Sequence, residues 1–122
     1  MPKSLKKAEL ARESWKCLVR HPHHTNIRPF VESVLESSLG SILHAHTSLA
    51  ALVVSTEHRW DAPGPKVIVR PIVGGFYLEG FDPESGEEVE YRVDSVGEAL
   101  SHFLRLVAYL LDEAKCGDDH LG

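Results

Sequence analysis

The chain has few cysteines, which in small or exported proteins form the disulfides that add to the stability of the core. Its 122 residues include only two cysteines, Cys17 and Cys116, which lie far apart in sequence. Such a pair resembles neither a disulfide framework nor a zinc knuckle, so we expect two reduced thiols. The chain has no run of about eighteen apolar residues, and its first residues, MPKSLKKAELARES, lack the apolar core of a signal peptide. These absences predict a cytoplasmic protein without a membrane span.

Motifs that mark enzymes are also missing. The sequence contains no HExxH, CxxC or GxSxG pattern, and the stretch GGFYLEG at 74–80 matches neither a phosphate loop nor a dinucleotide fingerprint. We therefore expect a non-catalytic protein that needs no cofactor. With 122 residues, of which 43% are hydrophobic, the chain has the size of one domain spanning residues 1–122.

Charge is distributed unevenly along the chain. Residues 1–29 hold seven Lys or Arg against two Glu, a net charge of +5, whereas the remainder holds six basic and sixteen acidic residues, a net charge of −10. A basic end attached to an acidic body suits electrostatic docking onto a charged partner or a second copy of the chain. Apolar residues recur at helical spacing over residues 1–20, and the other face is basic. This pattern predicts a basic amphipathic helix that ends before Pro22.

A second helix is predicted over residues 29–44, where apolar residues again follow helical spacing behind Pro29. The next stretch, HTSLAALVVST, is ambiguous. Its apolar residues continue the helical phase, but LVVST is short, apolar and rich in β-branched residues, as a buried strand would be. We expect the helix to continue to about Leu52, with a strand at 50–56 as the alternative.

Residues 66–94 predict a three-stranded antiparallel meander. Gly74-Gly75 is interpreted as a two-residue hairpin turn, because glycine readily supplies the positive φ that such turns require. This turn sets Val73 opposite Phe76 and Arg70 opposite Glu79, an opposite-charge pair across the strands.

The second turn of the meander, DPESGE, is expected to close with Asp82 opposite Glu87, which places Tyr77 opposite Arg92. Because strand side chains alternate, one face of the sheet is apolar and the other is wet. The apolar face carries Val69, Pro71, Val73, Phe76, Leu78, Val89, Tyr91 and Val93. The opposite face carries Arg70, Glu79, Glu88, Glu90 and Arg92.

The last helix begins with a capping box, Ser95 to Glu98, and its apolar stripe runs to about Ala114. Gly117 is expected to end it and to leave 115–122 as a disordered tail. The predicted fold class is therefore α+β: two N-terminal helices, a three-stranded antiparallel β-meander, possibly with a fourth strand near 50–56, and a C-terminal helix packed on the apolar sheet face. Three apolar helices exceed what three strands can cover, so we expect a homodimer.

The densest group of chemistry-bearing side chains lies in and after RHPHHTNIRP at 20–29. It consists of histidines, the commonest zinc ligand: His21, His23, His24, His44 and His46. The spacing completes no known ligand pattern. On a helix, positions 44 and 46 lie about 200° apart, and only on a strand do they point together. We interpret this stretch as the joint between two helices, with a metal site as the alternative.

These observations predict a small non-catalytic factor that binds another protein, such as an adaptor, inhibitor, antitoxin-like or immunity-like protein. The residues expected to bind the partner are charged side chains of the first helix or of the second turn: Lys6, Lys7, Arg12, Lys16, Glu84, Glu87, Glu88 and Glu90. The alternative is a histidine-based metal-dependent hydrolase. A third hypothesis is nucleic-acid binding through the basic helix, against which stand the net charge of −5 and the absence of a recognisable motif.

Overall fold

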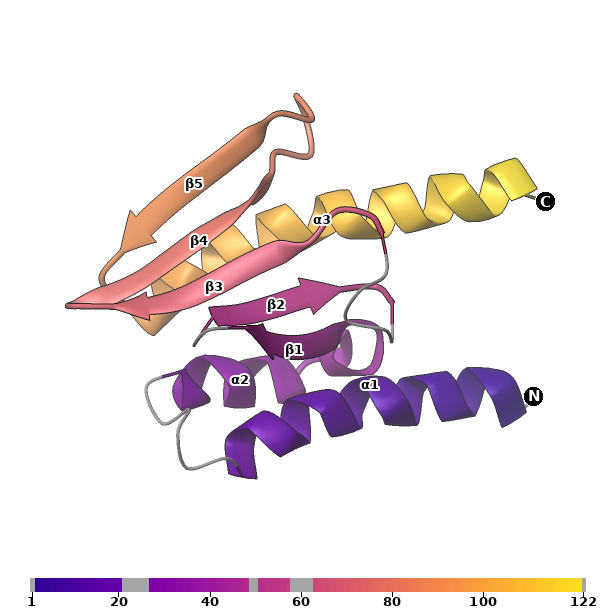
Figure 1. Cartoon of the computed structure of the whole chain (residues 1–122), viewed down its shortest axis with the longest axis horizontal. Coiled ribbons are helices and arrows are strands. Elements are labelled where there is room, and N and C mark those ends of the chain that lie inside the picture. The colour runs from indigo at the N-terminus through magenta and orange to yellow at the C-terminus, as the bar shows by residue number, and fades with distance from the viewer. Residues whose placement is uncertain (1, 21–26, 49–50, 58–62, 122) are drawn as a thin grey trace.

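The computed structural model describes residues 2–20, 27–48, 51–57 and 63–121, with side chains described from Lys7 to Glu113 within these ranges (Figure 1). Within these ranges, three α-helices, one short 3₁₀ helix and five strands follow one another. In order they are α1 (Pro2–Arg20), α2 (Arg28–Leu35), η2 (Ser38–Ser41), β1 (His44–Ser48), β2 (Ala51–Ser55), β3 (Val67–Ile72), β4 (Gly75–Phe81), β5 (Glu88–Val93) and α3 (Val96–Leu121).

The five strands form one sheet, so the predicted fold class is wrong in its strand number. Neighbouring strands are antiparallel, and their order in the sheet follows the sequence from β1 to β5. A three-stranded meander, even with a fourth strand near 50–56, leaves out β1. The segment 50–56 does hold a strand, β2, and β1 lies where the sequence predicts the end of a helix.

The helix expected over 29–44 ends much earlier, at Leu35, because local contacts turn the chain there. Ser37 donates its hydroxyl to the Val34 carbonyl at 2.7 Å and accepts from the Leu39 amide at 3.3 Å. Gly40 then packs so close to the Val34 carbonyl that a Cβ would lie 3.3 Å from it. The apolar residues that continue the helical pattern are used in the turn and in the core instead.

Segment 51–55 is a strand because it pairs with a neighbouring strand on each side. Leu52 pairs with Thr47 of β1 and with Val69 of β3. Four of the five residues of β2 are buried: Ala51, Leu52, Val54 and Ser55. A helix here would leave the backbone groups of β3 that face β2 without these partners, and buried backbone groups are almost always paired.

The first hairpin turns one residue earlier than predicted. Ile72 pairs with Gly75, so Val73 and Gly74 form the turn, with Gly74 at a φ of 82°. Gly75 belongs to the strand, where it lies against the Val93 carbonyl and a Cβ would collide with that oxygen. The register therefore shifts by two residues, Arg70 faces Tyr77 rather than Glu79, and Val73 is fully exposed rather than on the apolar face.

The second hairpin has the predicted register. The Asp82 amide donates to the Glu87 carbonyl at 2.9 Å, and Tyr77 pairs with Arg92. Both strands alternate: Phe76, Leu78 and Gly80 are buried, and the residues between them are half-buried. This part of the meander follows from local turn chemistry and from the period-two pattern.

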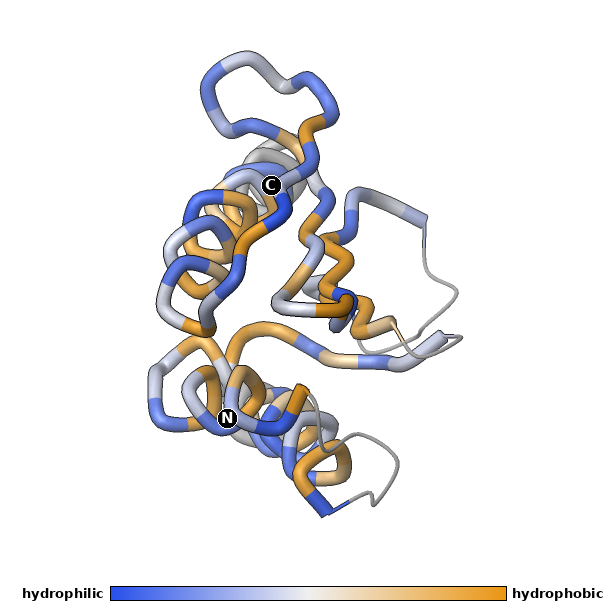
Figure 2. The backbone as a smooth tube through the Cα atoms, turned by 90° about the vertical axis from the view of Figure 1, so that its left-hand side faces the viewer, coloured by the Kyte–Doolittle hydropathy of each residue, from blue (hydrophilic) through white to orange (hydrophobic). Residues whose placement is uncertain are grey.

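The three helices share one core with the sheet. The Phe103 ring of α3 lies edge-on to Trp15 of α1 at 6.4 Å and to Phe30 of α2 at 4.9 Å, and Phe30 also contacts Phe76 of β4 at 6.3 Å. Figure 2 shows hydrophobic and hydrophilic residues alternating around the helices, as expected for elements that bury one side only. None of the helices in the described ranges has the length and apolar character that a membrane span requires.

The last helix is longer than predicted. It begins after Ser95, whose hydroxyl accepts from the Glu98 amide at 3.2 Å, in line with the expected cap. It then continues past Ala114 and Gly117 to Leu121, over most of the segment expected to be a disordered tail. A glycine inside a helix costs only about 1 kcal/mol relative to alanine, which is too little to force an end by itself.

One edge of the sheet is covered by α1. The Ala45 amide of β1 donates to the Ser14 hydroxyl at 2.9 Å, and the Trp15 indole Nε1 donates to the Leu43 carbonyl at 2.9 Å. Both bonds use backbone groups on the side of β1 that faces away from β2. Side chains of α1 thus occupy the hydrogen-bonding positions that another strand would take.

The other face of β3–β5 has no helix against it in the part of the chain that the structure describes (Figures 1 and 2). We call this the open face. It carries the half-buried or exposed side chains that alternate with the core residues of these three strands: Ile68, Arg70, Ile72, Tyr77, Glu79, Glu88, Glu90 and Arg92.

Candidate functional site

The open face centres on Tyr77, in the middle strand of the three. Its hydroxyl lies 2.7 Å from a carboxylate oxygen of Glu90 and 2.9 Å from one of Glu79. Glu79 and Glu90 are direct partners across β4 and β5. A hydroxyl has one proton to donate, so at any moment only one of these two carboxylates receives a hydrogen bond from it.

Two arginines flank the same ring. The guanidinium carbon of Arg70 lies 5.6 Å from the centroid of the Tyr77 ring, and that of Arg92 lies 5.8 Å from it. Arg70, Tyr77 and Arg92 are paired across β3, β4 and β5, so the register itself puts one arginine on each side of the tyrosine. Both distances fall within the range of a cation–π contact.

The carboxylates keep the tyrosine protonated. The hydrogen bond to Glu90, and then that to Glu79, raise the pKa of Tyr77 well above its ordinary value of 10.0. Ionisation would place a third negative charge beside two carboxylates and would break the hydrogen bond that the hydroxyl donates. The centre of the open face therefore presents a phenol among two arginines and two glutamates. We call these five residues the Tyr77 cluster: Arg70, Tyr77, Glu79, Glu90 and Arg92.

The described part of the molecule includes two shallow hollows. One, of about 250 Å³, lies beside the Tyr77 cluster and is lined by Glu79, Glu88, Val89 and Glu90. The other, of about 180 Å³, lies between the β2–β3 connection and α3, with Lys66 and Glu113 among its lining residues. Sites for small molecules usually measure roughly 300–1,000 Å³ and enclose most of the ligand.

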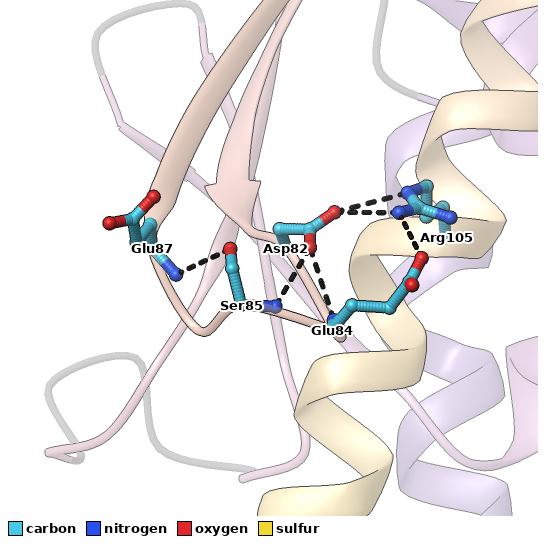
Figure 3. Close-up of polar contacts among 5 residues, drawn as sticks. All are labelled: Asp82, Glu84, Ser85, Glu87 and Arg105. Carbon is cyan, nitrogen blue, oxygen red and sulfur yellow. Dashed lines mark hydrogen bonds and ion pairs between the residues drawn. The ribbon is translucent and has the colours of Figure 1, made fainter.

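The acidic turn between β4 and β5 is tied to α3 (Figure 3). Arg105 of α3 donates from Nη2 to Asp82 at 2.8 Å and to Glu84 at 2.8 Å, and from Nε to Asp82 at 3.2 Å. The other carboxylate oxygen of Asp82 accepts from the amides of Glu84 and Ser85 at 3.1 and 2.9 Å. The turn is therefore held both by its own backbone amides and by Arg105 of α3.

These contacts favour the ionised form of Asp82. The hydrogen bond from the Ser85 amide is the largest cause, followed on the same side by the contact with Arg105, and together they lower the pKa of Asp82 below its ordinary value. The charge of Asp82 is thus compensated within the chain. It has a structural role, that of holding the turn against α3.

The structure separates the four acidic residues that the sequence predicts as partner-binding. Glu84 is paired with Arg105, and Glu87 lies in the exposed turn, with its amide donating to the Ser85 hydroxyl. Glu88 and Glu90 both lie on the open face of β5. Glu90 accepts from the Tyr77 hydroxyl, and both glutamates line the hollow beside it.

The four basic residues predicted to bind a partner lie at the far end of the molecule. The side chain of Lys6 is outside the described residues. Lys7 and Lys16 are exposed, but nine positions on a helix correspond to a rotation of about 180°, so they lie on opposite sides of α1. Arg12 is half-buried and donates to the Ser41 hydroxyl at 3.4 Å. Figure 1 shows α1 beside β1, across the sheet from the acidic turn.

The histidines are only partly described. His21, His23 and His24 lie outside the described residues. His44 and His46 are on β1, a strand rather than a helix, so they point to the same side; His44 is buried and His46 is half-buried. Among the residues that the structure describes, no three His, Cys, Asp or Glu side chains come together as a metal site.

Tyr77 is the residue that sequence reasoning missed. The predicted register of the second hairpin already sets Tyr77 opposite Arg92, and strand alternation places it with the charged face. The correct first turn then adds Arg70 on its other side. A search for aromatic residues between opposite charges on the wet face of the meander would have found this cluster.

Comparisons of the chain with protein-family models, with curated proteins and with solved structures give no match.

Proposed function

We propose that this chain is a small non-catalytic factor that binds another protein, as an adaptor, inhibitor, antitoxin-like or immunity-like factor in the cytoplasm, and that it does so with the open face. The observation that carries the proposal is the Tyr77 cluster. Tyrosine and arginine are the residues most enriched, together with tryptophan, among those that dominate binding energy in protein interfaces. Here Tyr77 stands between Arg70 and Arg92 on a sheet face that no described helix covers.

The rigidity of the cluster supports the same function. Tyr77 lies within hydrogen-bonding distance of Glu79 and Glu90, and the arginines lie over its ring, so the side chains are held in place before a partner arrives. A pre-ordered surface loses less conformational entropy on binding than a mobile one. The shape of the face also fits a protein better than a small molecule, because its hollow is shallow.

The partner that suits this face presents a basic side chain. The hollow beside Tyr77 is lined by Glu79, Glu88 and Glu90, and a lysine or arginine there would meet three carboxylates. The two arginines of the cluster would in turn favour an acidic or carbonyl-rich rim around that basic residue. The acidic turn beyond it is already neutralised in part by Arg105 and contributes less.

The test begins with capture of binding proteins from the native host and continues with purified components. For a partner that binds directly, we expect Tyr77→Ala and Arg70→Ala each to weaken the affinity by about tenfold or more, as hot-spot residues do. Lys16→Ala on α1 is the matched control, because Lys16 is exposed and lies at the other end of the molecule. The affinity of the Lys16→Ala variant for the partner should stay within about twofold of that of the unchanged protein.

Three results would point elsewhere. A partner that is lost with Lys16→Ala and kept with Tyr77→Ala would move the binding surface to α1. Steeply salt-dependent binding to DNA or RNA would favour the nucleic-acid hypothesis. Stoichiometric zinc, manganese or iron in the purified protein would favour the metal-dependent hydrolase. The unfolding midpoints of all variants in urea are measured alongside, so that loss of binding is not confused with loss of the fold.

A further inference from the structure

The two edges of the sheet differ in how they are protected. At the β1 edge, Ser14 and Trp15 of α1 bond to outward-facing backbone groups at Ala45 and Leu43. At the β5 edge, no described element lies outside the strand; β5 packs only against β4 and α3 among the main contacts (Figure 1). β5 is also six residues long and contains neither proline nor glycine. It is an edge on which another strand can pair.

The backbone groups that β5 offers can be identified from the register. The hairpin closes with the Asp82 amide bonded to the Glu87 carbonyl, and hydrogen-bonded and non-hydrogen-bonded pairs then alternate along an antiparallel ladder. The odd-numbered residues of β5 therefore bond to β4. The even-numbered residues, Glu88, Glu90 and Arg92, point their amides and carbonyls away from the sheet.

We propose that a second copy of the chain pairs with this edge, β5 against β5, in the antiparallel register that sets Glu90 of one copy opposite Arg92 of the other. The two-fold axis then passes between the two Tyr91 residues. Both backbone and side chains fit this arrangement. Glu90 and Arg92 are outward-facing backbone positions, so they form hydrogen-bonded pairs, and their side chains form two opposite-charge pairs on the open face.

The apolar side of β5 also matches itself in this register. Val89 of one copy lies opposite Val93 of the other, and Tyr91 lies opposite Tyr91. These three residues are half-buried against the core and lie on the side of α3, where the Tyr91 ring stacks on His102 at 4.0 Å. Pairing would complete their burial, which is favourable for apolar and aromatic surface.

The neighbouring registers place like charges at the centre of the interface. A shift of two residues in one direction pairs Glu88 with Arg92 but sets Glu90 opposite Glu90 at the two-fold axis, and a shift in the other sets Arg92 opposite Arg92; like charges directly opposite each other are destabilising. Charged residues on an edge normally prevent pairing with other chains. The outward charges of β5 are Glu88, Glu90 and Arg92, and the proposed register sets each Arg92 opposite a glutamate without a like-charge pair at the centre of the interface. The cost of this register is a like-charge contact between Glu88 and Asp94 at each exposed end.

The dimer would be a continuous sheet of ten strands, five from each copy, with both sets of helices on the same side. The two open faces would then lie side by side on the other. Pairing of β5 is independent of the proposed partner binding, since a monomeric protein could still use the open face. The variants that test the open face, at Tyr77 and Arg70, leave Glu90 and Arg92 unchanged.

The test is charge reversal at the two paired positions, read by sedimentation at about 10–100 µM protein, where a specific dimer of this size is populated. The unchanged chain should be a dimer. Glu90→Arg sets arginine against arginine, and Arg92→Glu sets glutamate against glutamate, so each should raise the dissociation constant by about tenfold or more. The double variant restores both pairs and should restore the dimer.

An equimolar mixture of the two single variants is the sharpest part of the test. The Glu90→Arg chain carries arginine at both paired positions, and the Arg92→Glu chain carries glutamate at both. Both pairs between positions 90 and 92 in a mixed dimer would therefore join opposite charges, so the mixture should dimerise although neither variant does alone. Glu90→Arg also removes an acceptor of the Tyr77 hydroxyl within its own chain. Mixing cannot repair a folding defect inside one chain, so recovery on mixing can come only from the interface.

Amide hydrogen exchange gives a second measurement. Protection of the Glu90 and Arg92 amides should appear in the dimer and vanish in the single variants, while the Val89 and Tyr91 amides, which bond to β4, stay protected in all. The proposal is overturned if the unchanged chain is a monomer at about 100 µM, or if it is a dimer that charge reversal does not weaken. A mixture that stays monomeric would also overturn this register.

Discussion

The buried hydrogen bond between α1 and the sheet edge gives a quantitative prediction. Trp15 is fully buried, its Nε1 donates to the Leu43 carbonyl at 2.9 Å, and its ring lies edge-on to Phe103. Trp15→Phe keeps an aromatic ring in the core but removes the donor and part of the ring volume. It therefore tests whether α1 protects the edge of β1 as the contacts indicate.

The cost of Trp15→Phe has two parts. The Leu43 carbonyl loses its partner in a buried position, which costs about 1–3 kcal/mol. The smaller ring system also removes two buried carbons and leaves space behind, which costs roughly 1–2 kcal/mol more. The sum of about 2–5 kcal/mol is a large part of a typical folding free energy of about 5–15 kcal/mol. At roughly 4 °C per kcal/mol for a chain of this length, the thermal midpoint should fall by about 8–20 °C.

The assay is unfolding in urea followed by far-ultraviolet circular dichroism, because removal of a tryptophan alters the fluorescence signal itself. Ser14→Ala removes the acceptor of the Ala45 amide and should cost about 1 kcal/mol. Lys16→Ala, one position beyond Trp15 and exposed, is the control and should stay within about 0.5 kcal/mol of the unchanged protein. If Trp15→Phe also stays within about 0.5 kcal/mol, the indole does not hold α1 on the edge.

Three further predictions concern other parts of the molecule. Gly75→Ala should strongly lower the urea midpoint, because its Cβ would collide with the Val93 carbonyl, whereas Gly97→Ala, with nothing within 4 Å, should not. In an absorbance titration of tyrosinate, Tyr77 should ionise at higher pH than an ordinary tyrosine, and Tyr77→Phe should remove that late component. The stability that depends on its raised pKa is present below the unfolded-state value of about 10 and is lost as pH rises through the folded value. The lowered pKa of Asp82 acts in the opposite direction: its contribution is present above about pH 4 and is lost on acidification, so Asp82→Asn should flatten the acid limb of the stability profile.

The reason for expecting a homodimer changes with the observed fold. The sequence predicts a dimer because three apolar helices exceed the face of a three-stranded sheet. Five strands supply more apolar area, and the exposed large hydrophobic side chains in the described part of the chain are scattered over different elements: Leu10, Ile42, Val73 and Leu104. No single apolar patch among them indicates an interface. The prediction of a dimer now depends on the free edge of β5 rather than on surplus apolar surface.

The candidate site could be predicted from the sequence in part. Alternation along the meander places Arg70, Glu79, Glu90 and Arg92 on its wet face, and they are found there. Their convergence on Tyr77 depends on the register, which was right for the second hairpin and wrong by two residues for the first. The error arose because Gly75 meets a steric need within the sheet, the approach of the Val93 carbonyl, which no local pattern reveals.

The elements whose cause is local follow from short stretches of the amino-acid sequence. A hairpin turn, a capping serine and a period of two or of 3.6 residues act over a few positions, and they were enough for β4, β5 and the start of α3. Contacts between distant segments, in contrast, make His44–Ser48 and Ala51–Ser55 strands and place α1 over the edge of β1. These segments fit a helical pattern as well as an extended one. The extended form is favoured by the hydrogen bonds that β3 offers. It is also favoured by two side chains some thirty positions earlier in the chain, because Ser14 accepts from the Ala45 amide and Trp15 donates to the Leu43 carbonyl.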